Sequence, residues 1–575
     1  MLRSHWKRIL PVIGLLIVFV VLVLLSSKDT FPLYHEGERV FNGYSYLEYG
    51  NSINQASYSV FISALGAIPL LFTSIDYPAE FSYENPKEFG QRQFLYYGEN
   101  NAQKIIFLAR LPFLFLGVLL GLFIFLWGNE LFNYKAGILA LLFFAFSPLM
   151  IAYTPIVGAD FALAVFFFLS TYFFWKFYKN PRPLFLLCCG FFFGLAVLTK
   201  LPAILLLPIF FGLGVIGILV KKPIALKTDK HFRTLLSSLG IILLLGVAVF
   251  ITLNLNEIHP LYNFDDPLYQ ASGARSQERL DEILYSLDLS ENNKEKIEYI
   301  LTKVPIVAPH FFQGLYSIST VIENGREAYF YGTYQSGIPT GLRYLVLFLL
   351  KNPISFLLLL ILSLLFLWKN ISGKGFDLLF MIIPILVFPL QFVFTPFYGG
   401  LVYLLPLYPF LFLLIGNLVN YKELRNNIGR MILFGLVFSY IFVCFISFPY
   451  YLSYFNALAG GTMNGYTVSL DEFDYFQDLY RLEAYIKENN ITNAKVNFGD
   501  YSTTLPYQDF PYTYLEPNLP QSGLIFIDAN ALFAEKEKDR QNFAWLREFT
   551  PDQRIGTTIF VYTISEQDLQ EKGYV

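Results

Sequence analysis

The sequence predicts an α-helical polytopic membrane protein with about 11 transmembrane helices and a small extracytoplasmic C-terminal α/β domain. Composition is the first observation: the 575 residues are 55% hydrophobic and only 15% charged, with a mean hydropathy of +0.48. The second is that apolar runs of about 20 residues recur, the length that crosses a hydrocarbon core of ~30 Å as a helix. The third is that basic residues gather in alternate loops. Together these features exclude a soluble globular class.

The predicted spans follow one another from the N-terminus in three groups. They lie at residues 9–26, 105–128, 135–154, 161–178, 183–199, 202–220, 235–256, 352–368, 376–395, 401–418 and 430–450. No small-residue cleavage site follows the first span, so we expect a retained signal anchor. The three cysteines, Cys188, Cys189 and Cys444, fall within spans and lack the spacing of a metal site.

Charge distribution predicts the orientation. With the N-terminus in the cytoplasm, the inner segments hold 17 Lys and Arg against 4 Asp and Glu, whereas the rest of the chain holds 24 against 40. Cytoplasmic loops of membrane proteins carry an excess of basic residues. The inner segments are residues 1–8, 129–135, 176–183, 221–234, 369–377 and 419–430. We therefore expect an integral plasma (inner) membrane protein with a cytoplasmic N-terminus and with its large loops and C-terminal domain extracytoplasmic.

Two parts are predicted along the chain. Residues 1–450 form a transmembrane module with large outer loops at 27–104 and 257–351, and residues 451–575 form an extracytoplasmic α/β domain. The apolar stretch 59–72 in the first loop is too short to span comfortably, which predicts a helix in the membrane interface.

The soluble parts carry their own periodicity. Residues 276–289 predict a polar helix in the second outer loop, and residues 471–490 predict an amphipathic helix in the tail. Short apolar stretches at 494–498, 523–528 and 557–564 predict strands. These elements favour a small α/β domain after the last span.

Ionisable side chains avoid the span centres and gather at the outer ends of the spans. They are Glu36, Glu38, Arg110, Asp160, Lys200, Arg343 and Lys351. A transporter instead places ionisable groups near the bilayer midplane, often in broken helices. An acid–base layer at the outer interface suits a reaction between a lipid-borne head group and a molecule in the outer aqueous space.

Each of these residues also has a structural interpretation. Arg110 and Lys351 can snorkel to lipid head groups. Asp160 can cap the fourth span, because acids favour helix N-termini. Glu36 and Glu38 can be solvated loop charges. The functional interpretation depends on the layer that these side chains share.

Several stretches, in one order along almost the whole chain, resemble a known family. They are HEGERVFNGYSYLEYG (35–50), ARLPFLFLG (109–117), FAFSPLMIAYTPIVGADFALAVFFFL (144–169), GLAVLTKLPAILLLP (194–208), NGREAYFYGTYQSG (324–337), RYLVLFLLKNPISFLLL (343–359), VYLLPLYPFLF (402–412) and YFNALAGG (454–461). In this order they resemble the bacterial branch of the dolichyl-phosphate-mannose-protein mannosyltransferase-like family, whose members are membrane glycosyltransferases of the GT-C fold.

Two positions and one stretch depart from the family pattern. His35 stands where the family has the Asp of an Asp-Glu pair, and Val402 stands where it has an Arg. The stretch 54–61, NQASYSVF, replaces the family's acidic and Pro-Pro segment. The first departure concerns the catalytic base, and the other two concern the binding of the donor or its phosphate.

The resemblance implies a hexosyl or pentosyl transferase. It would move a sugar from a polyprenyl-phosphate-linked donor to a protein, lipid or glycan acceptor at the outer membrane face, with no nucleic-acid partner. An acceptor hydroxyl needs a general base as it attacks the anomeric carbon, and Glu36 is the first candidate and Asp160 the second. The departing phosphate needs fixed cations. Lys200 is the first candidate for this role, followed by Arg343 and Arg110.

Four alternatives remain open on the sequence. A divalent metal cation is a candidate cofactor, with Glu36, Asp160 and His35 as its ligands. His35 is itself a candidate base, because histidine ordinarily titrates near neutral pH. The third alternative is that the chain is a degenerate relative that binds lipid-linked glycan without catalysis. The fourth is that it is a transporter.

Overall fold

The computed structural model describes most of the membrane module and nearly the whole tail. The described residues are 2–33, 35–50, 60–78, 93–220, 231–253, 258–260, 280, 284, 290–307, 328–335, 340–369, 371–393, 399–533, 539 and 541–574. The predicted polar helix at 276–289 and most of the substituted stretch 54–61 lie outside them.

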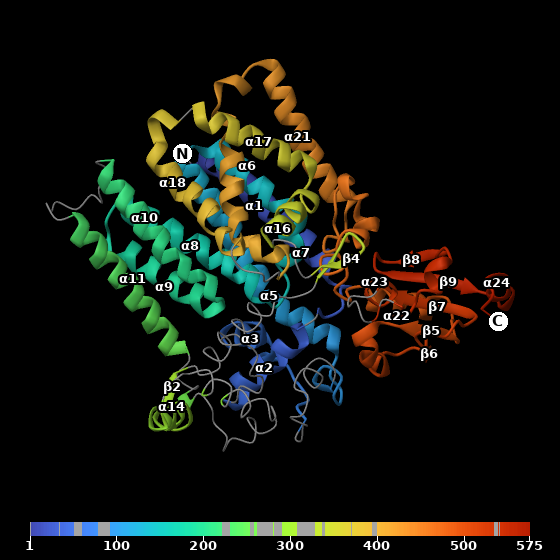
Figure 1. Ribbon diagram of the computed structural model, residues 1–575. Helices are drawn as coiled ribbons and strands as arrows, with labels where there is room; N and C mark the ends of the chain where they lie inside the picture. The colour runs from blue at the N-terminus through green and yellow to red at the C-terminus, as the bar shows by residue number, and fades with distance from the viewer. Residues whose placement is uncertain are drawn as a thin grey trace.

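The predicted apolar segments are helical, and the predicted class of helical polytopic membrane protein with a small mixed sheet is confirmed (Figure 1). Among the described residues, eight helices are long and apolar enough to cross a membrane. These spans are Trp6–Ser27, Ala102–Leu131, Ala159–Lys179, Leu201–Leu219, Leu235–Thr252, Gly375–Val393, Leu401–Asn420 and Asn427–Ile446.

The helical elements of the module are closely spaced along the chain. They are α1 (Leu2–Ser27), α2 (Glu36–Tyr49), α3 (Phe61–Ala67), η1 (Ile68–Phe72), α5 (Ala102–Leu131), α6 (Tyr134–Ala145), α7 (Pro148–Tyr153), α8 (Ala159–Lys179), α9 (Pro183–Thr199), η3 (Leu201–Leu205), α10 (Leu206–Leu219), α11 (His231–Leu253), α14 (Glu291–Lys303), α16 (Thr340–Leu350), α17 (Ile354–Lys369), α18 (Ile371–Val387), α19 (Leu390–Val393), η4 (Leu401–Leu407), α20 (Tyr408–Gly416), η5 (Asn417–Asn420), η6 (Lys422–Leu424) and α21 (Asn427–Ile446). Short strand pairs lie between α11 and α16: β1 (Ile258–Pro260) with β2 (Pro305–Val307), and β3 (Ala328–Phe330) with β4 (Thr333–Gln335).

Three of the predicted spans take a different form, which explains why the predicted count of about 11 exceeds the eight long helices. α6 and α9 have only 12 and 17 residues. α16 and α17 are bent against each other by 114°. Proline is the physical reason at two of these places, because it disfavours helical geometry in the residue before it. Pro148 follows the end of α6, and Pro353 lies in the bend between α16 and α17.

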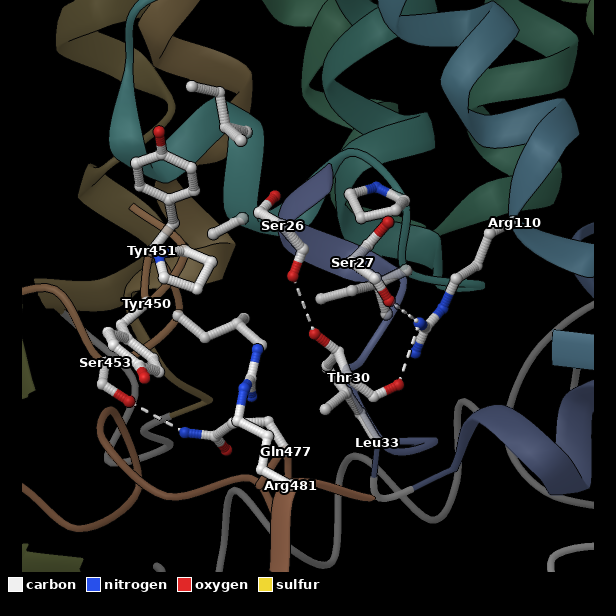
Figure 2. A pocket seen from close by; sticks show the side chains of 16 residues that line it. Ser26, Ser27, Thr30, Leu33, Arg110, Tyr450, Tyr451, Ser453, Gln477 and Arg481 are labelled. Carbon is white, nitrogen blue, oxygen red and sulfur yellow. Dashed lines mark hydrogen bonds between the residues drawn. The ribbon is translucent and has the colours of Figure 1, made fainter. Parts of the chain in front are cut away.

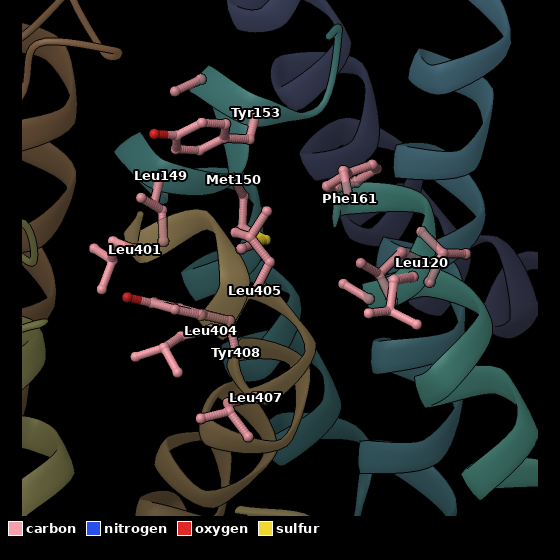
Figure 3. Packing of buried hydrophobic residues seen from close by; sticks show 14 of the residues in the cluster. Leu120, Leu149, Met150, Tyr153, Phe161, Leu401, Leu404, Leu405, Leu407 and Tyr408 are labelled. Atoms are coloured by element: carbon pink, nitrogen blue, oxygen red, sulfur yellow. The ribbon is translucent and has the colours of Figure 1, made fainter. Parts of the chain in front are cut away.

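α8 and α20 form the centre of the bundle. In an apolar 18-residue stretch of α8, 89% is buried inside the protein, and in that of the Leu401–Asn420 span 83% is buried. A helix that is apolar all round belongs in such a position. Figure 3 shows Tyr408 and the leucines of η4 packed beside Leu149, Met150 and Tyr153 of α7. By contrast, only 17% of α21 and 22% of the α11 span are buried, which leaves these helices to face lipid.

Two short helices, α2 and α3, lie together at one end of the bundle (Figure 1). α3 and η1 together occupy the stretch predicted to be an interfacial helix. The two helices touch through their backbones at Gly43, because a Cβ there would overlap the carbonyl of Ser63. α2 carries His35 at its N-cap and Glu36, Glu38 and Arg39 in its first turn. This contact therefore sets the position of the predicted site residues of the first loop.

The tail contains one sheet beside the bundle (Figure 1). In the described tail residues, five strands pair in the order β6-β5-β7-β9-β8. β5 is parallel to β6 and β7, and β9 is antiparallel to β7 and β8. The main elements are α22 (Leu479–Glu488), β5 (Ala494–Asn497), β6 (Tyr512–Tyr514), β7 (Gly523–Asp528), α23 (Ala529–Phe533), β8 (Gln553–Ile555), β9 (Ile559–Ile564) and α24 (Glu566–Glu571). The predicted strands are found as β5, β7 and β9, whereas β6 and β8 are too short to show an alternating pattern.

A buried ion pair joins the tail to the membrane module. Lys351, at the bend between α16 and α17, lies 3.4 Å from Oε2 of Glu472, and both side chains are buried. Lys351 Nζ also donates to the carbonyl of Leu452 at 3.0 Å and to that of Glu472. Glu472 Oε1 accepts from the backbone N–H of Leu401 at 2.5 Å. Because removing one partner of a buried pair costs about 3–5 kcal/mol, this contact holds the tail firmly on the bundle.

Candidate active site

An acid and a base meet where α8 begins and α9 ends. Lys200 Nζ lies 2.5 Å from Oδ1 of Asp160 and 3.3 Å from the centroid of the Tyr403 ring. The Lys200 side chain is 5% exposed, whereas that of Asp160 is 23% exposed. Asp160 occupies the first turn of α8, where the helix dipole favours an acid, and Lys200 is extended just before Pro202. The site therefore combines a fixed, nearly buried cation with a carboxylate that solvent still reaches.

Glu36 is bound on all sides by hydrogen-bond donors. Arg110 donates from Nε to Oε1 at 2.9 Å and from Nη2 to Oε2 at 2.7 Å. The backbone N–H groups of Leu33 and Val157 donate to the same carboxylate, each at 3.1 Å. Arg110 Nη1 in turn donates to the carbonyls of Ser27 and Thr30. Since a carboxylate has about four acceptor sites, Glu36 has little capacity left for a substrate proton in this arrangement.

His35 pairs with a different carboxylate of the same helix. His35 Nδ1 lies 2.8 Å from Oε2 of Glu38, whose side chain is 4% exposed against 33% for His35. One turn further, Arg39 Nη1 donates to the carbonyl of Val157 at 2.9 Å. Glu36 and Arg39 thus hold the two sides of Val157, three residues before Asp160. This clamp fixes α2 relative to the start of α8.

Five of the six predicted site residues therefore lie in three separate pairs, and the sixth, Arg343, lies apart. Asp160 and Lys200 are brought together, Glu36 and Arg110 bind each other, and His35 binds Glu38. Arg343 lies apart on α16, buried, with its guanidinium 5.8 Å from the ring of Phe330.

Sequence reasoning missed a polar chain that the tail contributes near the bundle. Tyr475 hydrogen-bonds to Tyr153 at 2.7 Å between the two hydroxyls, and it donates to Glu472 Oε2 at 3.5 Å. Glu472 is separated from Lys351 by 121 residues, so no local pattern marks their pairing. Tyr403 is likewise missed, although it follows Val402 directly in a stretch that carries the family resemblance.

Arg110 also borders a small pocket between the bundle and the tail (Figure 2). Its walls include the hydroxyl side chains of Ser26, Ser27 and Thr30, together with Arg481 from the tail. The cavity measures about 30 Å³, enough for roughly one water molecule. Neither Asp160 nor Lys200 lines it. This pocket is therefore too small for a sugar and is separate from the acid–base pair.

The predicted metal ligands are not assembled into a metal site. In the part of the chain that the structure describes, no group of three or more His, Cys, Asp or Glu side chains is placed to hold a metal ion. Glu36 is occupied by Arg110 and backbone donors, and Asp160 is neutralised by Lys200. Within the described ranges, Glu36, Asp160 and His35 are thus not arranged as the ligands of one divalent cation.

Comparison with known proteins supports the resemblance found in the sequence. Residues 102–251 match the family model described as Dolichyl-phosphate-mannose-protein mannosyltransferase, which confirms the predicted resemblance over the segment that carries Arg110, Asp160 and Lys200. No curated protein matches the chain in sequence.

Solved structures of membrane enzymes are similar in shape. The apo oligosaccharyltransferase of Archaeoglobus fulgidus is 11% identical with a TM-score of 0.49, over 88% of this chain and 64% of that chain. The oligosaccharyltransferase AglB from Archaeoglobus fulgidus, in complex with an inhibitory peptide and a dolichol-phosphate, is 11% identical with a TM-score of 0.46, over 98% of this chain and 75% of that chain. ArnT from Cupriavidus metallidurans bound to undecaprenyl phosphate is 13% identical with a TM-score of 0.44, over 98% of this chain and 99% of that chain. This chain thus spans less than two thirds of the first of these proteins.

Proposed function

We propose that this protein is a membrane glycosyltransferase that moves a sugar from a polyprenyl-phosphate-linked donor to an acceptor hydroxyl at the outer face of the plasma membrane. The observation that carries the proposal is the Asp160–Lys200 pair at the ends of two membrane helices. The match of residues 102–251 to a mannosyltransferase family model supports it. The dolichol-phosphate and undecaprenyl phosphate bound to AglB and ArnT suggest the same kind of lipid carrier here.

Lys200 is the proposed phosphate ligand. Its ammonium lies between a carboxylate and a tyrosine ring in a nearly buried position, where an electrostatic contact is stronger than in water. A lipid phosphate that reaches this place competes with Asp160 for the same Nζ. As the bond between the anomeric carbon and the phosphate oxygen breaks, the electron pair passes to the phosphate, and Lys200 stabilises the charge that develops there.

Asp160 is the proposed base. When the phosphate takes over Lys200, the Asp160 carboxylate is released and its exposed oxygen can accept the proton of the acceptor hydroxyl. The acceptor oxygen forms its bond to the anomeric carbon in the same step. The pairing of Glu36 with Arg110 favours Asp160 over Glu36 for this role, and it assigns Glu36 and Arg110 to positioning α2.

The test compares lipids from cells that lack the gene with lipids from cells that carry defined variants. We expect a polyprenyl-phospho-sugar to accumulate in the deletion strain and to disappear when the wild-type chain is restored. Asp160→Asn and Lys200→Met should leave the accumulation at least tenfold above the wild-type level. Lys104→Met is the matched control, because Lys104 is exposed near the outer end of α5.

Membrane levels of every variant are measured in the same cells. Full removal of the lipid by Asp160→Asn and Lys200→Met at normal protein levels would refute the assignment of the site. A deletion strain without any accumulated polyprenyl-phospho-sugar would refute the proposed activity.

A further inference from the structure

A second, larger cavity lies between the tail and the outer ends of the membrane helices. We call it the junction cleft, and its walls come from α22, from β8 and from Asp29 and Gln103 at the outer ends of α1 and α5. Gln103 Nε2 donates to the carbonyl of Lys28 at 3.1 Å, which joins the two membrane helices at the rim of the cleft. The volume is about 650 Å³, within the range of about 300–1,000 Å³ that small-molecule sites occupy.

Tyrosine rings form part of the walls of the junction cleft, and the hydroxyl of one of them, Tyr480, is buried. Tyr450, Tyr480 and Tyr485 line it, and all three are partly exposed. The guanidinium of Arg481 lies over the ring of Tyr450, 5.2 Å from the ring centroid. The hydroxyl of Tyr485 accepts from Gln553 Nε2 at 2.5 Å, which fixes its ring across the gap between α22 and β8. Such a side chain offers an apolar face for C–H groups and a hydroxyl for hydrogen bonds.

The charged side chains of the junction cleft balance one another in number, Asp29, Glu483 and Glu488 against Arg481, Lys487 and Arg554, and each cation already has a partner. Arg481 Nη1 lies 2.5 Å from Oδ1 of Asp478, and Lys487 Nζ lies 2.8 Å from both Glu483 and Asp509. Arg554, the remaining basic residue of the wall, donates to the carbonyl of Met463 and lies against the Phe560 ring, 4.2 Å from its centroid. A phosphate or an acidic peptide would therefore have to displace existing partners of each cation.

Two amides and a carboxylate supply the remaining polarity of the wall. Gln103 and Gln553 carry amides, and Glu488 carries a carboxylate with acceptor oxygens. Large apolar side chains that could anchor a peptide are scarce, since Ile555 and Ala484 are the aliphatic residues of this wall. A ligand with C–H faces and many hydroxyls, and without net charge, matches these walls.

We infer that the junction cleft binds a neutral oligosaccharide, whose sugar faces lie on Tyr480 and Tyr485 and whose hydroxyls bind Glu483, Glu488 and Gln103. The binding site itself stands on the cleft, whereas the role of this glycan as an acceptor rests on the proposed function. The position of the cleft fits that role, because its rim includes Asp29, two residues after the end of α1, and Gln103 in the first turn of α5.

The test measures binding to the full-length chain in lipid nanodiscs. The probes are fluorescently labelled maltotriose, mannotriose and chitotriose, and neutral oligosaccharides released from the cell envelope of the host. We expect at least one of these probes to bind, and we expect Tyr485→Ala and Glu483→Ala each to weaken it at least tenfold. Tyr514→Ala is the matched control, because Tyr514 is exposed on β6 at the opposite edge of the sheet and should leave the affinity unchanged.

Two further measurements keep the outcomes separate. Glu483 forms a surface ion pair, so Glu483→Ala remains informative if Tyr485→Ala fails to fold. Asp160→Asn should bind the probe as the wild type does, so that a failure of the proposed activity would leave this binding intact. Failure of every neutral probe to bind, binding that survives both cleft variants, or preferential binding of tripolyphosphate or a labelled peptide library would each overturn the inference.

Discussion

Replacing Glu36 by Gln tests whether this residue holds the structure together or takes part in the chemistry. The change keeps the shape of the side chain but removes its charge and turns one acceptor oxygen into a donor. Arg110, whose side chain is 7% exposed, would then keep its charge without a carboxylate partner. Breaking a buried pair in this way costs about 3–5 kcal/mol, and each buried donor that loses its acceptor costs about 1–3 kcal/mol.

The remaining contacts of Arg110 reduce that cost. Its Nη1 group still donates to the carbonyls of Ser27 and Thr30, at 2.9 and 3.1 Å. We therefore expect Glu36→Gln to lower the free energy of unfolding by about 4 kcal/mol. Adding Arg110→Met should restore at least about 1 kcal/mol, because the unmatched charge disappears with it. Glu48→Gln on the exposed side of α2 is the control and should have no effect.

The chain provides its own probes for this measurement. Cys189 and Cys444 are fully buried, so a thiol-reactive fluorophore reports their exposure as the protein unfolds on heating. The midpoint of that transition is compared with sugar transfer by the same samples at a temperature where all variants are folded. An unchanged midpoint together with lost transfer would refute the structural role and assign Glu36 to catalysis. An unchanged midpoint with normal transfer would refute the inference that the pair stabilises the fold.

Two other predictions follow from the packing and the charges. Gly43→Ala should destabilise the protein in the same thermal assay, because its methyl group would overlap the Ser63 carbonyl, whereas Gly14→Ala on α1 meets open space and should be neutral; equal midpoints would contradict the contact. In the tail, burial and the nearby Asp478 raise the pKa of Asp474 to about 7 from an ordinary 3.8, so the folded tail holds a proton that the unfolded chain releases. The protonated Asp474 stabilises the folded tail below pH 4, and this stabilisation is lost as the pH rises through 7. The temperature at the midpoint of thermal unfolding should therefore decrease as the pH is raised from 5 to 8. Asp474→Asn should remove most of that decrease. The same pH dependence in the variant would contradict this origin.

The helices of the bundle could be predicted because apolar composition and length alone determine them. α8 shows this clearly: its run of Phe, Leu and Ala is apolar on every side, and the structure buries it at the centre. The form of the shorter spans could not be predicted in the same way. Pro148 and Pro353 are visible in the sequence, but whether a proline divides one span or separates two depends on the helices packed against it.

The sequence predicts a layer of ionisable side chains but not how they pair. Charge and position led to the prediction that Glu36, Arg110, Asp160 and Lys200 share the outer membrane edge. Which acid meets which base depends on helix packing, since Glu36 and Arg110 are 74 residues apart and Asp160 and Lys200 are 40 apart. The pairing of Glu472 with Lys351 could not be predicted for the same reason, because the two residues are 121 positions apart and meet only where the tail packs against the bundle.

The pairing also gives a physical reason for the unusual residue at position 35. Oε2 of Glu38 lies 2.8 Å from the ring of His35 in the first turn of α2. An aspartate at position 35 would place a second carboxylate beside this buried acid, and two like charges at that distance disfavour each other. Histidine instead makes a hydrogen bond with Glu38 and leaves the α2 clamp on Val157 undisturbed. The departure at His35 is thus matched by Glu38 within the same helix, while the Asp160–Lys200 pair on α8 and α9 stays complete, and this is why we assign the chemistry to that pair.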